Sequence, residues 1–151
     1  INDFFINQLK GFKDVIDDIT GTMNGIGWVI SGFSLLVGGF GIANIMFVSV
    51  KERTNLIGIQ KSLGAKNKFI LFQFLFEAVI LSLIGGLIGL ILVFIVSVIA
   101  SSFSGDFNFV LSPWNMFLGT AISAIIGLIS GIVPAISASK LDPVEAIRTG
   151  Q

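Results

Sequence analysis

The sequence of 151 residues contains no cysteine and no histidine, and it has 15 phenylalanines but no tyrosine. Without Cys and His, disulfides, thiol nucleophiles, most zinc sites and the usual side-chain proton shuttle are excluded. Charged residues make up 12% of the chain, against about 25% in typical soluble domains. Hydrophobic residues make up 54%, and the mean hydropathy is +0.96. This composition indicates a membrane protein.

Three apolar segments are each long enough to cross a bilayer, whose hydrocarbon core of ~30 Å requires about 20 helical residues. They cover residues 26–50, 69–101 and 114–138. The alternative is a buried helical core in a soluble protein, which three such segments in so short a chain disfavour. We therefore predict an all-α integral membrane protein with three transmembrane helices.

The distribution of Lys and Arg predicts the orientation of these spans. The loop at 51–68 carries five basic residues and the tail at 139–151 carries two, whereas the loop at 102–113 carries none. Cytoplasmic loops are enriched in Lys and Arg. We therefore expect the loop at 51–68 and the C-terminus in the cytoplasm, and residues 1–25 outside it. The net charge of zero gives no indication of nucleic acid as a partner.

Residues 1–25 carry apolar side chains at alternating spacings of four and three, the pattern of a coiled-coil seam. The seam consists of Phe5, Leu9, Phe12, Ile16, Ile19 and Met23. We predict an amphipathic stalk helix that stands outside the membrane, leads into the first span and pairs with a second copy. A helix lying flat on the bilayer is the alternative, which the acidic character of the polar face disfavours.

Small residues recur at every fourth position of the third span and form a ridge along one helix face. The ridge consists of Gly119, Ser123, Gly127, Gly131, Ala135 and Ser139. In lipid, small residues let helix backbones approach closely, so the ridge is predicted to pack against a helix of this chain or of a second copy. The second span offers a weaker signal, a single GxxxG at Gly85 and Gly89.

Asn44 and Glu77 are the polar candidates inside the spans. Glu77 is the only ionisable residue within a predicted span and lies near its cytoplasmic end. Ionisable residues in spans are costly and often functional. Here we expect the carboxylate to reach the interface or pair with a lysine, and we favour this structural role over one in transport.

The loop at 51–68 has the pattern of a short amphipathic helix. Its apolar face consists of Leu56, Ile59 and Leu63. Thr54 or Asn55 can cap the N-terminus, Gly64 stands where a helix-ending glycine is expected, and Lys61 suits the dipole at that end. Such a helix either contacts a protein partner or rests on lipid headgroups, and the pattern alone favours neither.

Residues 39–89, GFGIANIMFVSVKERTNLIGIQKSLGAKNKFILFQFLFEAVILSLIGGLIG, resemble the C-terminal permease region of MacB/FtsX-type ABC transporters. The family pattern is a glycine-rich span ending in NIM.VSV, then ERT.EIGI..ALGA, then F..EA..LS..GG..G. The tail PAISASKLDPVEAIR (134–148) is similar to the family's closing P...A..LDP.EALR. Two departures stand out: Asn55 and Leu56 replace a common Arg-Glu pair, and Ser62 replaces a common Ala.

The resemblance implies a permease of four spans with a large extracytoplasmic domain between the first and the second. This chain would hold the last three spans and the stalk helix. Such permeases sit in the bacterial cytoplasmic membrane, dimerise, and seat a cytoplasmic coupling helix in an ABC ATPase subunit or domain. The ATPase-docking residues implied here are Glu52, Arg53, Thr54, Ile57, Gly58, Ile59, Lys61, Leu63, Gly64 and Ala65.

The resemblance also implies mechanotransmission, in which ATP-driven closure is passed up the stalk to the outside. The chain has no GxxxxGK[ST] motif, so we expect no enzyme activity and no cofactor in it, with ATP and magnesium held by the ATPase. The expected partners are that ATPase, a second copy, the lipid bilayer and an extracytoplasmic protein. Two alternatives stay open: an FtsX-like regulator of cell-wall hydrolases, and a channel or secondary-transporter fragment, which would need more polar groups at the midplane.

Overall fold

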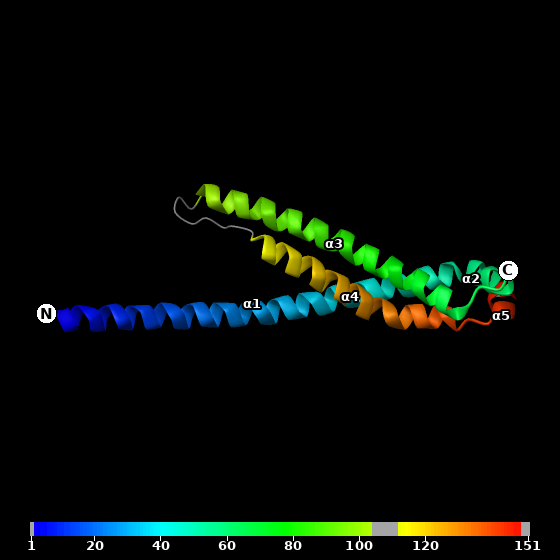
Figure 1. The fold of residues 1–151 in the computed structure, drawn as a ribbon, viewed down its shortest axis with the longest axis horizontal. Helices are drawn as coiled ribbons and strands as arrows, with labels where there is room; N and C mark the ends of the chain where they lie inside the picture. The colour runs from blue at the N-terminus through cyan, green and yellow to red at the C-terminus, as the bar shows by residue number, and fades with distance from the viewer. Residues whose placement is uncertain (1, 104–111, 149–151) are drawn as a thin grey trace. The chain divides into compact units, whose positions relative to one another are not determined.

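A computed structural model describes residues 2–103 and 112–148 of the chain, and within these ranges the fold is helical with no strand. Five helices follow one another: α1 (Asn2–Glu52), α2 (Thr54–Ser62), α3 (Asn67–Phe103), α4 (Pro113–Ser139) and α5 (Pro143–Arg148) (Figure 1). Most of the predicted outer loop, residues 104–111, lies outside the described residues.

Three of the helices are long and apolar enough to cross a membrane, namely Phe4–Glu52, Asn67–Ser102 and Pro113–Ser139. The predicted fold class, an all-α protein with three membrane-spanning helices, is therefore confirmed. α1 contains 51 residues, more than twice the about 20 that a span requires, so it includes both the predicted lead-in and the first span. The stalk and its place outside the membrane stay predictions.

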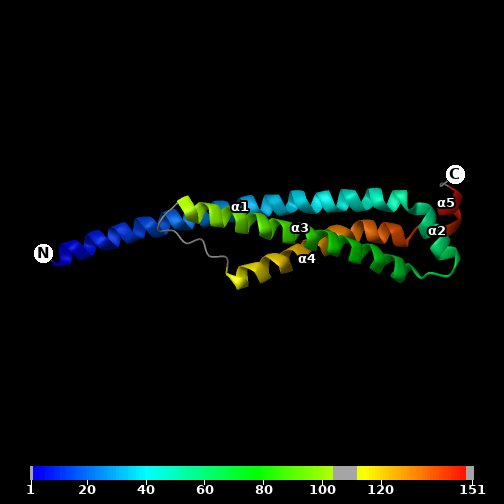
Figure 2. The ribbon, with the colours of Figure 1, turned by 90° about the horizontal axis from the view of Figure 1, so that it is seen from above.

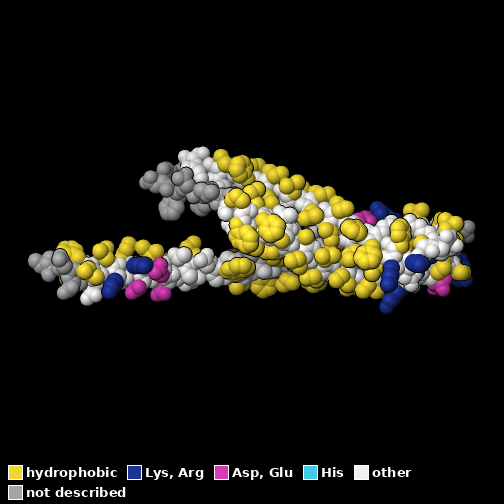
Figure 3. Space-filling view, viewed as in Figure 1, with side chains coloured by type: hydrophobic (Ala, Val, Ile, Leu, Met, Phe, Trp, Pro, Cys, Tyr) yellow, Lys and Arg dark blue, Asp and Glu magenta, His cyan; other side chains and the backbone are white. Residues whose placement is uncertain are grey.

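The chain divides into two compact units at Val37 and Gly38. The first unit is the part of α1 up to Val37. Its seam side chains, from Phe5 to Met23, are all exposed, with 46–69% of their surface accessible. In Figure 3 hydrophobic and charged side chains lie on opposite sides of this helix, as the amphipathic pattern requires. A partner for the seam remains a prediction.

The second unit contains the rest of α1 together with α2 to α5. α3 and α4 pack against each other along much of their length, and α2 packs against α5 (Figures 1 and 2). Figure 3 shows hydrophobic side chains over the middle of this unit and Lys and Arg gathered at the end with α2 and α5. Most large apolar side chains of the spans are exposed within one chain, as lipid-facing residues are.

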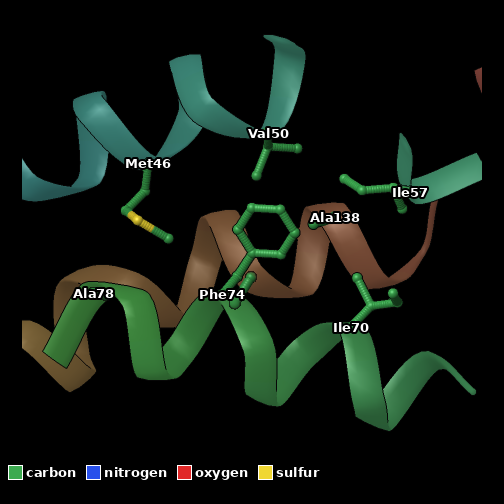
Figure 4. Close-up of a cluster of buried hydrophobic side chains, with 8 residues drawn as sticks. Met46, Val50, Ile57, Ile70, Phe74, Ala78 and Ala138 are labelled. Atoms are coloured by element: carbon green, nitrogen blue, oxygen red, sulfur yellow. The ribbon is translucent and has the colours of Figure 1, made fainter. Parts of the chain in front are cut away.

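The core of the second unit is a small apolar cluster close to α2. It consists of Met46, Val50, Ile57, Ile70, Phe74, Ala78, Ala135 and Ala138. The ring of Phe74, which is 1% exposed, lies between α1 and α4, with Met46 and Val50 on one side and Ala138 on the other (Figure 4). Ile57 reaches the same cluster from α2. The core therefore fixes one end of all three spans around the start of the cytoplasmic loop predicted from the sequence.

The small-residue ridge of α4 faces α3, in an antiparallel contact that keeps one register over three helical turns. An ideal Cβ atom on Gly131 would lie 2.5 Å from the Cβ of Ala78, and one on Gly127 would lie 2.6 Å from the Cβ of Ser82. Further along, an ideal Cβ on Gly86 would lie 2.6 Å from the Oγ of Ser123. At these points the two backbones are closer than a pair of side chains allows.

A hydrogen bond reinforces this contact, because the hydroxyl of Ser82 donates to the carbonyl of Ser123. Ser123 in turn donates to the carbonyl of Gly119 over 2.9 Å. Ala135, fully buried, continues the ridge into the apolar core. The small residues at this contact therefore let the two helices pack closely, and their hydroxyl groups are hydrogen-bonded. Both properties favour helix association in lipid.

The predicted GxxxG of α3 does not take part in this contact. Among the described residues, nothing lies within 4 Å of an ideal Cβ on Gly85 or Gly89. The residues of α3 that meet α4 are Ala78, Ser82 and Gly86, at helical spacing of four, and Gly85 and Gly89 lie on other faces of the helix. A contact of Gly85 and Gly89 with a second copy stays a prediction.

Candidate functional site

α2 begins directly after α1, without a loop between them. Arg53 is the N-cap residue, and its carbonyl accepts the first hydrogen bond of α2 from the N–H of Ile57 over 3.0 Å. Thr54 does not cap the helix as predicted: its hydroxyl donates to the carbonyl of Val50 over 2.9 Å. No side-chain cap forms, because the N-cap residue is Arg53, whose guanidinium has no acceptor. The N–H of Arg53 donates to the carbonyl of Ser49 over 3.0 Å.

α2 ends at Ser62, and Gly64 follows its C-cap residue Leu63, where the sequence predicts a helix-ending glycine. Gly64 has φ of +100°, a left-handed conformation that glycine adopts without steric cost. The N–H of Gly64 donates to Lys61 and the N–H of Ala65 donates to Gln60, both over 3.0 Å. These two bonds are the Schellman motif. It turns the chain sharply towards α3, which begins at Asn67.

One face of α2 packs against its own chain. Ile57 is 2% exposed in the core, and Gly58 is buried against α5. An ideal Cβ on Gly58 would lie 2.9 Å from the Cβ of Ala146 and 3.1 Å from Cγ1 of Ile147. Both residues belong to the predicted ATPase-docking set, but the structure places them inward, where they hold α2 in position.

Lys61 also points inward. Its Nζ donates to the carbonyls of Ser139 and Leu141, each over 2.6 Å. Ser139 lies in the last turn of α4, where carbonyls lack partners within the helix and a cation is favourable. The sequence predicted that Lys61 would complement the dipole of its own helix and contact the ATPase. Lys61 does stand in the last turn of α2, and a contact with the ATPase stays a prediction. Its amine also closes the C-terminus of α4, a contact that the periodicity of the loop does not reveal.

The opposite face of α2 is apolar and exposed. Leu56 is 59%, Ile59 is 42% and Leu63 is 84% exposed. These are the three residues that the helical spacing grouped into one face. The remaining members of the predicted docking set are Glu52 and Arg53, exposed at the α1–α2 junction, Thr54, partly buried, and Ala65, which packs against the apolar core.

α5 adds exposed apolar residues that the sequence analysis did not single out. The sequence Leu-Asp-Pro at 141–143 explains why this helix begins where it does. The carboxylate of Asp142 accepts from the N–H of Val144 over 2.8 Å, its carbonyl accepts from Ala146 over 2.9 Å, and Pro143 occupies the first helical position. Val144 is 75% exposed, so α5 presents an apolar residue as exposed as those of α2.

Charged residues surround these apolar faces. At this end of the second unit, the exposed basic residues are Lys51, Arg53, Lys66, Lys68, Lys140 and Arg148. The exposed acidic residues are Glu52, Asp142 and Glu145. The end of the second unit that carries α2 and α5 is therefore basic on balance, with apolar residues among the charges. Among the described residues no group of three His, Cys, Asp or Glu side chains is placed to hold a metal ion. The arrangement is suited to binding a partner.

Glu77 forms an ion pair with Arg53, with 3.2 Å between Oε2 and the arginine Nη1. From the sequence we expect this carboxylate to reach the interface or to pair with a lysine. The basic residue that it meets is Arg53, because the α1–α2 junction lies beside α3. The two side chains are 32% and 49% exposed, so solvent screens the pair. Asn44, the other polar candidate within a span, is exposed on α1.

The chain is similar in sequence to known permeases. The family model described as FtsX-like permease C-terminal matches residues 28–143. The macrolide export ATP-binding/permease protein MacB of Agrobacterium fabrum is 41% identical over 145 residues, and that of Mannheimia succiniciproducens is 42% identical over 145 residues. MacB of Shewanella sp. (strain W3-18-1) is 40% identical over 147 residues.

The matches with these relatives cover 96–97% of this chain but only 22–23% of each relative. The chain thus spans less than a quarter of the length of the curated proteins it matches. The family match includes the end of α1, the whole of α2, α3 and α4, and the first residue of α5. The chain therefore belongs to the FtsX-like permease C-terminal family, as a permease region of the MacB/FtsX type.

Proposed function

We propose that this chain couples ATP hydrolysis in the cytoplasm to a conformational change outside the membrane, as part of an ABC transporter that exports or extracts a substrate. The observation that carries the proposal is the exposed apolar face of α2, formed by Leu56, Ile59 and Leu63. The other face of the same helix is fixed to the chain by Ile57, Gly58 and Lys61. A short helix held in this way presents a rigid surface to a partner.

An ABC ATPase is the partner that the relatives support, because their names combine an ATP-binding part with a permease. The basic residues around α2 favour a cytoplasmic position for it, because cytoplasmic loops are enriched in Lys and Arg, and ATP is available there. α1 then leads from this end through the membrane towards the outside. Export is the activity we propose, after the named activity of the same relatives.

The test replaces Leu63, the most exposed of the three residues at 84%, by Glu, Lys or Met in the full-length protein in proteoliposomes. ATP hydrolysis coupled to substrate export is measured. We expect both charged variants to lose coupling and Leu63→Met to keep it, because an apolar contact tolerates another apolar side chain but not a charge of either sign.

The same three variants distinguish a protein partner from the membrane surface. On anionic headgroups, Leu63→Lys would be tolerated and only Leu63→Glu would be harmful. That pattern, or full coupling in both charged variants, would exclude an ATPase contact through this face. Melting temperature and expression of each variant serve as the control for folding, and they should not change, since the side chain contacts little of its own chain.

A further inference from the structure

α5 is fixed to α2 so closely that the two helices form one body. Gly58 permits this approach: besides its contacts with Ala146 and Ile147, an ideal Cβ there would lie 3.2 Å from the carbonyl of Pro143. Ala146, on the facing side of α5, is 2% exposed. Any side chain at position 58 would separate the helices, so the glycine keeps α5 against α2.

A second contact holds the segment that leads into α5. Lys61 binds the carbonyls of both Ser139 and Leu141, and the next residue, Asp142, caps α5. The amine of Lys61 therefore attaches the end of α4, the turn after it and the start of α5 to α2. Whatever binds α2 meets α5 in a fixed position.

α5 carries exposed apolar residues of its own beside α2. Ile147, which lies against Gly58, is 41% exposed, and Ile59, the neighbour of Gly58 in sequence, is 42% exposed. Val144 adds a further apolar side chain with 75% of its surface accessible. The spans bury their apolar residues in lipid, but α5 follows the end of the last span. Because α5 is fixed to α2, the partner that binds the exposed residues of α2 also meets Val144 and Ile147, which favours the ATP-binding part as the occupant.

We infer that α5 is a second docking element, so that the ATP-binding part of the transporter contacts a composite surface made of α2 and α5. The inference rests on the proposed function, and it adds a part of the surface that the coupling-helix pattern does not contain. Val144 and Ile147 contribute apolar contacts to the partner, Gly58 and Ala146 hold the two helices together, and Lys61 is a positioning residue.

The experiment uses the absence of cysteine in this chain. Single cysteines are placed at Val144, Leu63 and Phe76 in an otherwise cysteine-free full-length protein, labelled with a benzophenone maleimide and irradiated in nanodiscs. Mass spectrometry identifies the partner of each crosslink. Phe76 is the control, since it is 65% exposed and lies within the second predicted span. We expect Val144→Cys and Leu63→Cys to crosslink to the ATP-binding part and Phe76→Cys not to do so.

The outcomes separate the inference from the proposed function. Crosslinks of Val144→Cys to lipid or only to a second permease copy, with Leu63→Cys still reaching the ATP-binding part, would overturn the role of α5 and leave the proposed function standing. If neither residue reached the ATP-binding part, the proposed docking itself would fall.

A functional measurement complements the crosslinking. Val144→Asp should lower coupled ATP hydrolysis by about fivefold or more, the effect of losing one central contact at an interface, whereas Val144→Ile should keep it. Because Val144 is exposed, both variants should melt as the wild type does. Coupled hydrolysis unchanged by Val144→Asp would contradict the inference, whatever the crosslinks show of proximity.

Discussion

Exchanging a single methyl group between α3 and α4 tests whether the ridge contact holds the two helices together. In Gly131→Ala the new Cβ would lie 2.5 Å from the Cβ of Ala78, whereas unbonded carbons prefer ~3.5–4.0 Å. The helices must therefore separate by about 1 Å or more, at a cost of about 1–3 kcal/mol for overpacking. The better helix propensity of Ala returns up to about 1 kcal/mol, which leaves a net loss of up to about 2 kcal/mol.

The reverse change on α3 restores the fit. With Ala78→Gly present as well, the nearest remaining atoms to the new methyl are Cδ1 of Leu75 at 3.7 Å and Cα of residue 78 at 4.0 Å, which are ordinary contacts. Alone, Ala78→Gly loses a buried methyl, about 0.8 kcal/mol, and about 1 kcal/mol of helix propensity. Independent effects would sum to about 3 kcal/mol, but we expect the double variant within about 0.5 kcal/mol of the wild type.

Unfolding of the permease chain by SDS in mixed micelles, followed by circular dichroism, measures these differences. Gly85→Ala and Gly89→Ala are the matched controls, since both add a methyl to α3 where no described atom lies within 4 Å. They should leave stability unchanged or raise it slightly. If Gly131→Ala were as stable as these controls, or if the losses of the two single variants simply added in the double variant, the close contact between α3 and α4 would not be what holds these helices together.

Three further predictions concern the polar contacts of α2. Lys61→Met should lower stability by about 1–2 kcal/mol, because two carbonyls at the end of α4 lose their donor, and it should speed hydrogen exchange in residues 139–148. Lys61→Arg should restore part of the stability and part of the protection from exchange. Equal exchange rates in the wild type and both variants would contradict this prediction. Gly64→Ala should cost about 1–2 kcal/mol for its left-handed conformation, seen as a lower melting temperature. Arg53→Gln and Glu77→Gln should each cost less than about 1 kcal/mol, because the pair is partly exposed and screened; a double-mutant cycle giving a larger coupling would show that the pair is shielded from water.

The elements of this fold are largely predictable from the sequence, because the signals that specify them are local. The length of the apolar segments predicts the three long helices, and the glycine at position 64 predicts where α2 ends. The exposed face of α2 follows from the spacing of Leu56, Ile59 and Leu63. Each of these depends on residues within one or two helical turns, so no knowledge of the tertiary arrangement is needed.

The contacts between elements are not predictable in the same way. Gly58 and Lys61 belong to the loop in sequence, yet their partners, Ala146 and Ser139, lie some 80 positions further along the chain. The choice between Gly86 and the GxxxG of Gly85 and Gly89 is a question of which face of α3 meets α4. Apolar residues lie on nearly all faces of α3, so the sequence of this helix does not show which face packs against α4.

α2 is attached to each of the three spans by a different polar contact. The hydroxyl of Thr54 binds the carbonyl of Val50 in α1, the guanidinium of Arg53 binds Glu77 in α3, and the amine of Lys61 binds the carbonyl of Ser139 in α4. A partner that displaced α2 would therefore act on all three spans together rather than on one. The apolar cluster around Phe74 fills the space among these contacts, and close-packed cores transmit displacement because they have little room to deform. The end of the second unit that carries the exposed residues of α2 and α5 is thus also the end at which α2 contacts all three spans, as the proposed coupling to a docked partner requires.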